Sequence, residues 1–101
     1  MELPKLNNGS GKQIAWAEKI REEKLNSFQR ITGDNSTKTT KLVSPEYLKN
    51  IVQFGEAFFE KATNAKYWID NRDKFSMWGL PADVLREARG KTEAEGHKLR
   101  P

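Results

Sequence analysis

Apolar residues recur at three- and four-residue spacing over two long stretches of the chain, a pattern typical of amphipathic α-helices. In the first stretch, Ser10 and Gln13 match the S-x-x-Q capping box that begins many helices. Gly33 follows at a position where helices commonly end. We therefore predict one long helix over residues 11–31. Its apolar arc, which we expect to face the core, comprises Ile14, Trp16, Ala17, Ile20, Leu25, Phe28 and Ile31.

The second stretch, residues 45–62, has the strongest helical pattern in the chain. Ser44 can cap the helix, Pro45 suits its first position, and Glu46 favours the positive end of the helix dipole. Gly55 lies in mid-helix, where it is expected to allow a close crossing with the first helix near Trp16. The wide apolar face predicts the core helix of the fold, and it comprises Tyr47, Leu48, Ile51, Val52, Phe54, Phe58 and Phe59.

Two shorter helices complete the predicted fold. Thr63-Asn64 breaks the pattern and can cap a helix over residues 65–72; the alternative is that the second helix continues through this point as one kinked helix. Pro81 can start a last helix that ends at Gly90, over residues 81–89. No segment alternates with period two, so no sheet is expected. We predict an all-α fold, a small bundle in which two main antiparallel helices pack with two short ones.

The remaining segments are polar. Leu3 and Leu6 are expected to attach the extended residues 1–9 to the domain. Residues 33–43 form a polar loop, whose hydroxyls and amines at residues 37–41 can either touch phosphates or only face solvent. At 101 residues the chain suits one domain, which we place at residues 1–90, followed by a flexible polar tail at residues 91–101.

Composition narrows the chemistry that the chain can perform. There is no cysteine, which excludes disulfides, thiolate metal sites and cysteine nucleophiles, and the only histidine, His97, lies in the polar tail. A net charge of +4 permits a nucleic acid or an acidic protein surface as partner without demanding either. We expect no enzyme activity, no metal and no cofactor. The sequence shows no membrane-spanning run and no signal peptide, so a cytoplasmic protein is expected.

Two basic residues fall inside the apolar arc of the first helix. Arg21 and Lys24 project on the same side as Ala17 and Ile20 at about 100° per residue. One interpretation is that their aliphatic stems cover the core while their charged ends reach solvent. The other is that this part of the helix is a binding face with cationic anchors.

A second group of residues interleaves aromatic and basic side chains near the third helix. Such a mixture can stack nucleic-acid bases and hold phosphates, can form a protein-binding hot spot, or can be core with basic residues outside. All three interpretations stay open for this group. It comprises Lys66, Tyr67, Trp68, Arg72, Lys74, Phe75 and Trp78.

The N-terminal fifth of the chain resembles a pattern found in uncharacterised proteins of phages, plasmids and other bacterial mobile elements. The pattern reads L-P-x-L-x-G-S-x-K-Q-[IV]-x-W-A-x-x-I-R, and Leu3–Leu6 and Gly9–Arg21 are similar to it. Trp68-Ile69-Asp70 resembles a second short piece in such proteins. The chain departs from the pattern at Gly11, where a longer polar residue is expected. The resemblance brings no catalytic residues with it.

The resemblance implies an accessory protein of a mobile element. Small cysteine-free binding proteins in that setting either bind DNA or RNA, or block host nucleic-acid machinery as anti-CRISPR proteins do. We therefore expect a non-catalytic protein that docks on a nucleic-acid-processing protein or its complex with nucleic acid. Direct nucleic-acid binding is the alternative, and a scaffold or oligomer joined through the first helix is a third. The expected interface residues are Arg21, Lys24, Lys66, Tyr67, Trp68, Arg72, Lys74 and Trp78.

Overall fold

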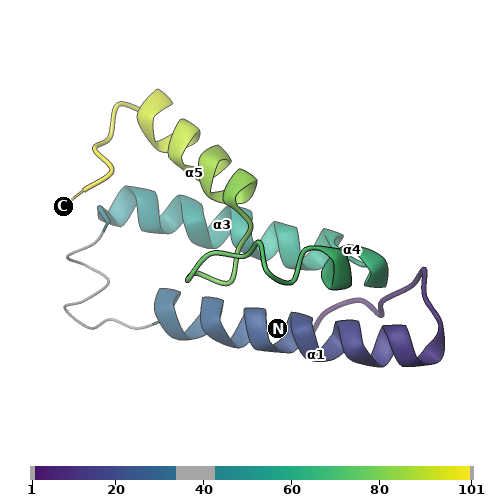
Figure 1. Ribbon diagram of the computed structural model, residues 1–101. Helices are drawn as coiled ribbons and strands as arrows, with labels where there is room; N and C mark the ends of the chain where they lie inside the picture. Colours follow the sequence, from purple (N-terminus) through teal and green to yellow (C-terminus); the bar gives the residue numbers. More distant parts are fainter. Residues whose placement is uncertain (1, 34–42, 101) are drawn as a thin grey trace.

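The computed structural model describes residues 2–33 and 43–100. Four helices occur in these ranges: α1 (Gly11–Thr32), α3 (Pro45–Lys61), α4 (Ala65–Asp70) and α5 (Ala82–Ala94). The only β-structure there is two isolated bridges, so the all-α prediction is confirmed. α1 and α3 run antiparallel, α5 turns back along α3 on the side away from α1, and α4 packs against α1 (Figure 1).

Three predicted helix starts are confirmed by their capping bonds. Ser10 and Gln13 form the reciprocal capping box, in which the Gln13 amide donates to Ser10 Oγ at 3.2 Å and the Ser10 amide to Gln13 Oε1 at 2.9 Å. Ser44 Oγ accepts the Tyr47 amide at 3.1 Å. Asn64 Oδ1 accepts the Lys66 amide at 2.9 Å, so the chain does break before α4. These bonds satisfy amides that would otherwise lack a partner in the first turn.

Aromatic side chains from α1, α3, α4 and the connector between α4 and α5 (residues 71–81) form the core. Trp68 is fully buried and stacks on Phe59 at 5.8 Å and on Phe75 at 5.2 Å between ring centroids. Phe59 also contacts Phe28 of α1 at 5.5 Å. Since aromatic burial dominates core energetics, this cluster joins the four segments into one body.

Two glycines allow this close packing. A Cβ on Gly55 would lie 2.5 Å from Phe28 Cε2, which confirms the predicted close crossing of α1 and α3 but shows that Phe28, not Trp16, is the partner. Gly79 adopts a φ of +73° and lies directly on the α1 backbone, where a Cβ would overlap the Lys24 carbonyl oxygen. The connector therefore lies against α1.

The prediction that Trp16 is a core residue is wrong. Trp16 is 47% exposed, whereas its neighbours Ala17 and Ile20 are buried. Trp16 lies at the edge of the apolar arc. α4 and the connector pack against α1 and leave one side of the indole in solvent.

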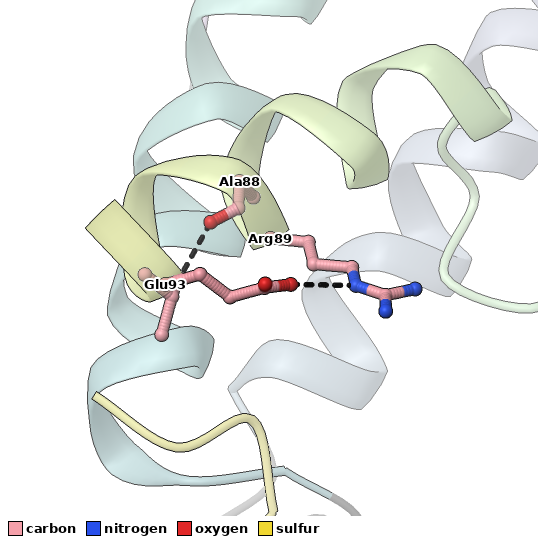
Figure 2. A network of polar contacts seen from close by, with 4 residues as sticks. Ala88, Arg89 and Glu93 are labelled. Atoms are coloured by element: carbon pink, nitrogen blue, oxygen red, sulfur yellow. Dashed lines mark hydrogen bonds and ion pairs between the residues drawn. The ribbon is translucent and has the colours of Figure 1, made fainter. Parts of the chain in front are cut away.

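The prediction that Gly90 ends the last helix is also wrong, because α5 continues to Ala94. Thr92 is fully buried and its Oγ1 accepts from Asn50 Nδ2 at 2.9 Å, which ties this end of α5 to α3. Glycine inside a helix costs only about 1 kcal/mol relative to alanine, and the contacts of Thr92 offset that cost. On the exposed side of α5, Arg89 pairs with Glu93 at 2.8 Å (Figure 2).

Described residues before α1 and after α5 are attached to the rest of the fold. Leu6 is buried, and the Asn7 amide donates to the Thr63 carbonyl at 2.8 Å, so the predicted attachment of the first residues is confirmed. After α5, the Leu99 carbonyl accepts the Ser44 amide at 2.8 Å. The flexibility expected of residues 91–101 stays a prediction, although residues 91–94 belong to α5. The phosphate-binding hypothesis for residues 37–41 concerns positions outside the described residues.

Candidate functional site

Two of the predicted interface residues are core residues. Trp68 is fully buried and Trp78 is 9% exposed. The indole Nε1 of Trp68 donates to the Ala62 carbonyl at 2.8 Å, so its one polar atom already has a partner inside the protein. The rings of Trp68 and Trp78 are therefore unable to stack on a partner, and the core interpretation holds for both.

Arg21 forms a hydrogen bond inside the protein. Its Nη1 donates to the Pro4 carbonyl at 2.6 Å, which fastens the N-terminal segment to α1. Partial burial lowers the pKa of Arg21 and the nearby Glu18 carboxylate acts in the opposite direction, but an arginine stays protonated in proteins. The interpretation in which the aliphatic stem covers apolar surface fits this side chain best.

Lys24 lies where the connector meets α1. Its Nζ is 5.7 Å from the centroid of the Phe75 ring, a cation–π distance, and the side chain is half-buried. Lys66, Arg72 and Lys74 are exposed. The structure thus brings Lys24 and Arg72 to the junction of α1 and the connector, and leaves Lys74 exposed on the connector and Lys66 exposed on α4.

Trp16 is the functional candidate that the sequence pattern missed. The guanidinium carbon of Arg72 lies 5.2 Å from the Trp16 ring centroid, so the cation covers part of the exposed indole. Lys12 and Lys19 lie one helical turn to either side of Trp16 and are also exposed. The only sequence signal for this exposure was the place of Trp16 at the edge of the apolar arc.

A mixed apolar and basic surface follows the junction of α1 and the connector. The connector follows α1 in the same direction. Arg72 contacts the Trp16 ring, Phe75 contacts Lys24, and Gly79 packs on the α1 backbone at Lys24 and Phe28. Trp16 and Met77, which is 66% exposed, are the large hydrophobic residues exposed within the described ranges. We call the α1–connector surface the set formed by Trp16 and Lys24 of α1 and the exposed connector residues Arg72, Lys74 and Met77.

A separate groove of about 890 Å³ lies between α3, the start of α5 and the turn at Asn7 and Asn8. We call it the α3–α5 groove. Neither α1 nor the connector contributes to its lining, so it is distinct from the α1–connector surface. Its apolar part includes Phe54, Phe58 and Val84, and the charged residues in its lining are Lys61, Asp83 and Glu87.

Tyr67, the remaining predicted interface residue, lines this groove and not the α1–connector surface. Burial raises the pKa of the Tyr67 phenol, and the negative charge of Asp83 raises it further. Asp83 Oδ1 accepts the Val84 amide at 3.1 Å, at the start of α5. A neutral phenol and two carboxylates thus face the same groove.

The described part of the chain holds no cluster of three or more His, Asp or Glu side chains that would suit a metal ion. None of the helices in residues 2–33 and 43–100 combines the length and apolar character needed to cross a bilayer. Comparisons of the chain with protein-family models, curated proteins and solved structures find no match. The assignment of function therefore depends on the surfaces described above.

Proposed function

We propose that this is a non-catalytic binding protein that docks on a nucleic-acid-processing protein, or on its complex with nucleic acid, through the α1–connector surface. The observation that carries the proposal is the Trp16 indole, 47% exposed on a helix that the core holds in place and partly covered by Arg72. Tryptophan and arginine dominate the residues that carry binding energy in protein interfaces.

Burial of this surface by a partner would be energetically favourable. Burial of the exposed part of the Trp16 ring would contribute about 2–3 kcal/mol at roughly 25 cal/mol per Å². Met77 adds a flexible apolar side chain that adapts to irregular contacts. Lys24, Arg72 and Lys74 favour an acidic partner surface by charge complementarity.

The nature of the partner rests on the resemblance to mobile-element proteins in the N-terminal motif. Accessory proteins in that setting include inhibitors of host nucleic-acid machinery, and anti-CRISPR-type inhibition is the specific form that we propose. Such an inhibitor needs a rigid scaffold with an aromatic and charged face, and it needs no catalytic residues. The proposal implies a cytoplasmic location.

Affinity capture from a bacterial lysate, carried out with and without nuclease treatment, tests the proposal. We expect the wild-type protein to retain a nucleic-acid-processing protein, and the Trp16→Ser variant to lose it. Arg86→Gln on α5 is the matched control, since Arg86 is exposed and lies outside the α1–connector surface. Recovery of generic chaperones alone, with Cas effectors fully active in the presence of the protein, would refute the proposal.

Direct binding of DNA or RNA is the second candidate. It is favoured by the position of Lys12, Lys19 and Arg72 around an exposed indole, because an aromatic ring can stack a base while cations hold the phosphates. Such binding should weaken steeply as salt concentration rises, since counterions are released. A gel shift with labelled DNA and RNA that shows no complex at low salt rules this candidate out.

A further inference from the structure

The α3–α5 groove exists because α5 covers only part of α3. At one end, Asn50 Nδ2 donates to Thr92 Oγ1 at 2.9 Å and Lys91 Nζ donates to Gln53 Oε1 at 3.1 Å. α5 begins at Ala82, and its first turns reach the middle of α3, whereas α3 continues to Lys61 (Figure 1). The final turns of α3 therefore have an apolar side that α5 covers only in part, with Lys91 Nζ of α5 lying 5.8 Å from the Phe54 ring centroid.

The apolar residues on this side of α3 recur at helical spacing, and the groove that they line has a defined length. Phe54, Ala57 and Phe58 lie at positions i, i+3 and i+4 of α3 and line the groove, with Val84 of α5 beside them. From Gln53 to Lys61 the groove follows α3 for about 12 Å, at about 1.5 Å per residue. That length accommodates about two turns of another helix. Grooves of this kind bind the apolar face of amphipathic helices in other proteins.

The charge of the lining points to the chemistry of the occupant. Asp83 and Glu87 are four residues apart on one face of α5, where two negative charges repel each other. Neither carboxylate forms an ion pair with another described residue, and Lys61 is the single basic residue in the lining. The part of the groove beside Asp83 and Glu87 is therefore locally negative, whereas Lys91 lies at its other end, beside Gln53 and Phe54. A cation placed between Asp83 and Glu87 would relieve their repulsion.

We propose that the α3–α5 groove binds a short amphipathic helix of a partner protein whose apolar face packs on Phe54, Ala57 and Phe58 and which places an arginine or lysine between Asp83 and Glu87. This is a second binding site, and it does not depend on the function proposed for the α1–connector surface. The apolar floor supplies affinity, and the two carboxylates select a basic helix over an acidic one.

Two synthetic peptides test the proposal directly. Both are blocked, helical and about twelve residues long with leucines at i, i+3, i+4 and i+7, and they differ only in whether two flanking positions are arginine or glutamate. In ¹H–¹⁵N NMR titrations of the full chain, we expect the arginine peptide to shift the amides of Phe54, Ala57 and Val84. It should bind about tenfold more tightly than the glutamate peptide.

Variants of the full chain show whether Asp83 and Glu87 cause the preference for the arginine peptide. Asp83→Asn with Glu87→Gln should remove the preference for the arginine peptide and leave the fold intact, since the amide oxygen of the substituted side chain can still accept the Val84 amide. Glu56→Gln, an exposed carboxylate outside the groove, is the matched control and should leave the preference unchanged. Equal affinity of both peptides for the wild type would overturn the proposal. Shifts centred on Trp16 and Arg72 in place of the groove residues would also overturn it.

Discussion

At the scale of single residues, Gly55 and Gly90 are both glycines inside helices but have opposite surroundings. A Cβ on Gly55 would press on the Phe28 ring, whereas a Cβ on Gly90 meets nothing within 4 Å. We expect Gly55→Ala to lower the free energy of unfolding by about 1–3 kcal/mol, because the core is overpacked. Gly90→Ala should raise it by about 0.5–1 kcal/mol through helix propensity. Urea unfolding followed by circular dichroism measures both, and a stabilised Gly55→Ala variant would contradict the packing described here.

Tyr47 and Tyr67 should lower the free energy of unfolding as the pH becomes alkaline. Burial raises the pKa of Tyr47 and of Tyr67 above the ordinary value of 10.0, and Asp83 adds to the effect at Tyr67. Below that value both phenols are protonated in the folded and unfolded states, so the two buried phenols make their full contribution to the free energy of unfolding. Above it the unfolded state loses its protons first, and stability falls as pH rises toward the folded pKa.

Replacement of both tyrosines by phenylalanine tests this pH dependence. The variant should lose less free energy of unfolding than the wild type between about pH 9 and pH 11, because the titration of the two buried phenols is removed. The measurement is the midpoint of urea unfolding at several pH values. Parallel pH profiles for the two proteins would show that the phenols do not contribute.

At the scale of elements, the attachment of α5 to α3 depends on Thr92. Its Oγ1 donates to the Ala88 carbonyl at 2.8 Å and accepts from Asn50 Nδ2 at 2.9 Å. Thr92→Val leaves the buried Asn50 amide with only Glu95 Oε1, at 3.3 Å, and should cost about 1–2 kcal/mol of unfolding free energy. Glu93→Gln on the exposed side of the same helix should leave stability nearly unchanged, because an ion pair exposed to solvent contributes little (Figure 2). Equal effects of the two substitutions would contradict this assignment.

Local chemistry explains which elements were predictable from the sequence. The helix starts at Ser10, Ser44 and Asn64 depend on side chain-to-backbone bonds within three residues, so the sequence pattern was sufficient to locate them. The continuation of α5 past Gly90 was missed because it depends on Thr92 packing against Asn50, which is 42 positions away in the sequence. Tertiary contacts of this kind override the local helix-ending tendency of glycine.

At the scale of the whole molecule, the candidate site was less predictable than the fold. Arg72 and Lys74 are exposed, but the burial of Trp68 and Trp78 and the exposure of Trp16 depend on how α4 and the connector lie on α1. Helical periodicity gives the direction of a side chain and not the extent of the element that covers it. Trp16, at the edge of the arc, was therefore the residue for which periodicity was least informative.

The central claim is that the α1–connector surface is where a nucleic-acid-processing partner binds. Site-specific photo-crosslinking tests it most directly, with p-benzoylphenylalanine placed at Lys19, one turn from Trp16, or at Arg86 on α5, which packs on the opposite side of α3 from α1 (Figure 1). In bacterial cells we expect a covalent adduct with a nucleic-acid-processing protein from position 19, and no adduct with that same protein from position 86. An adduct formed only from position 86, or no protein adduct from position 19, would contradict the account.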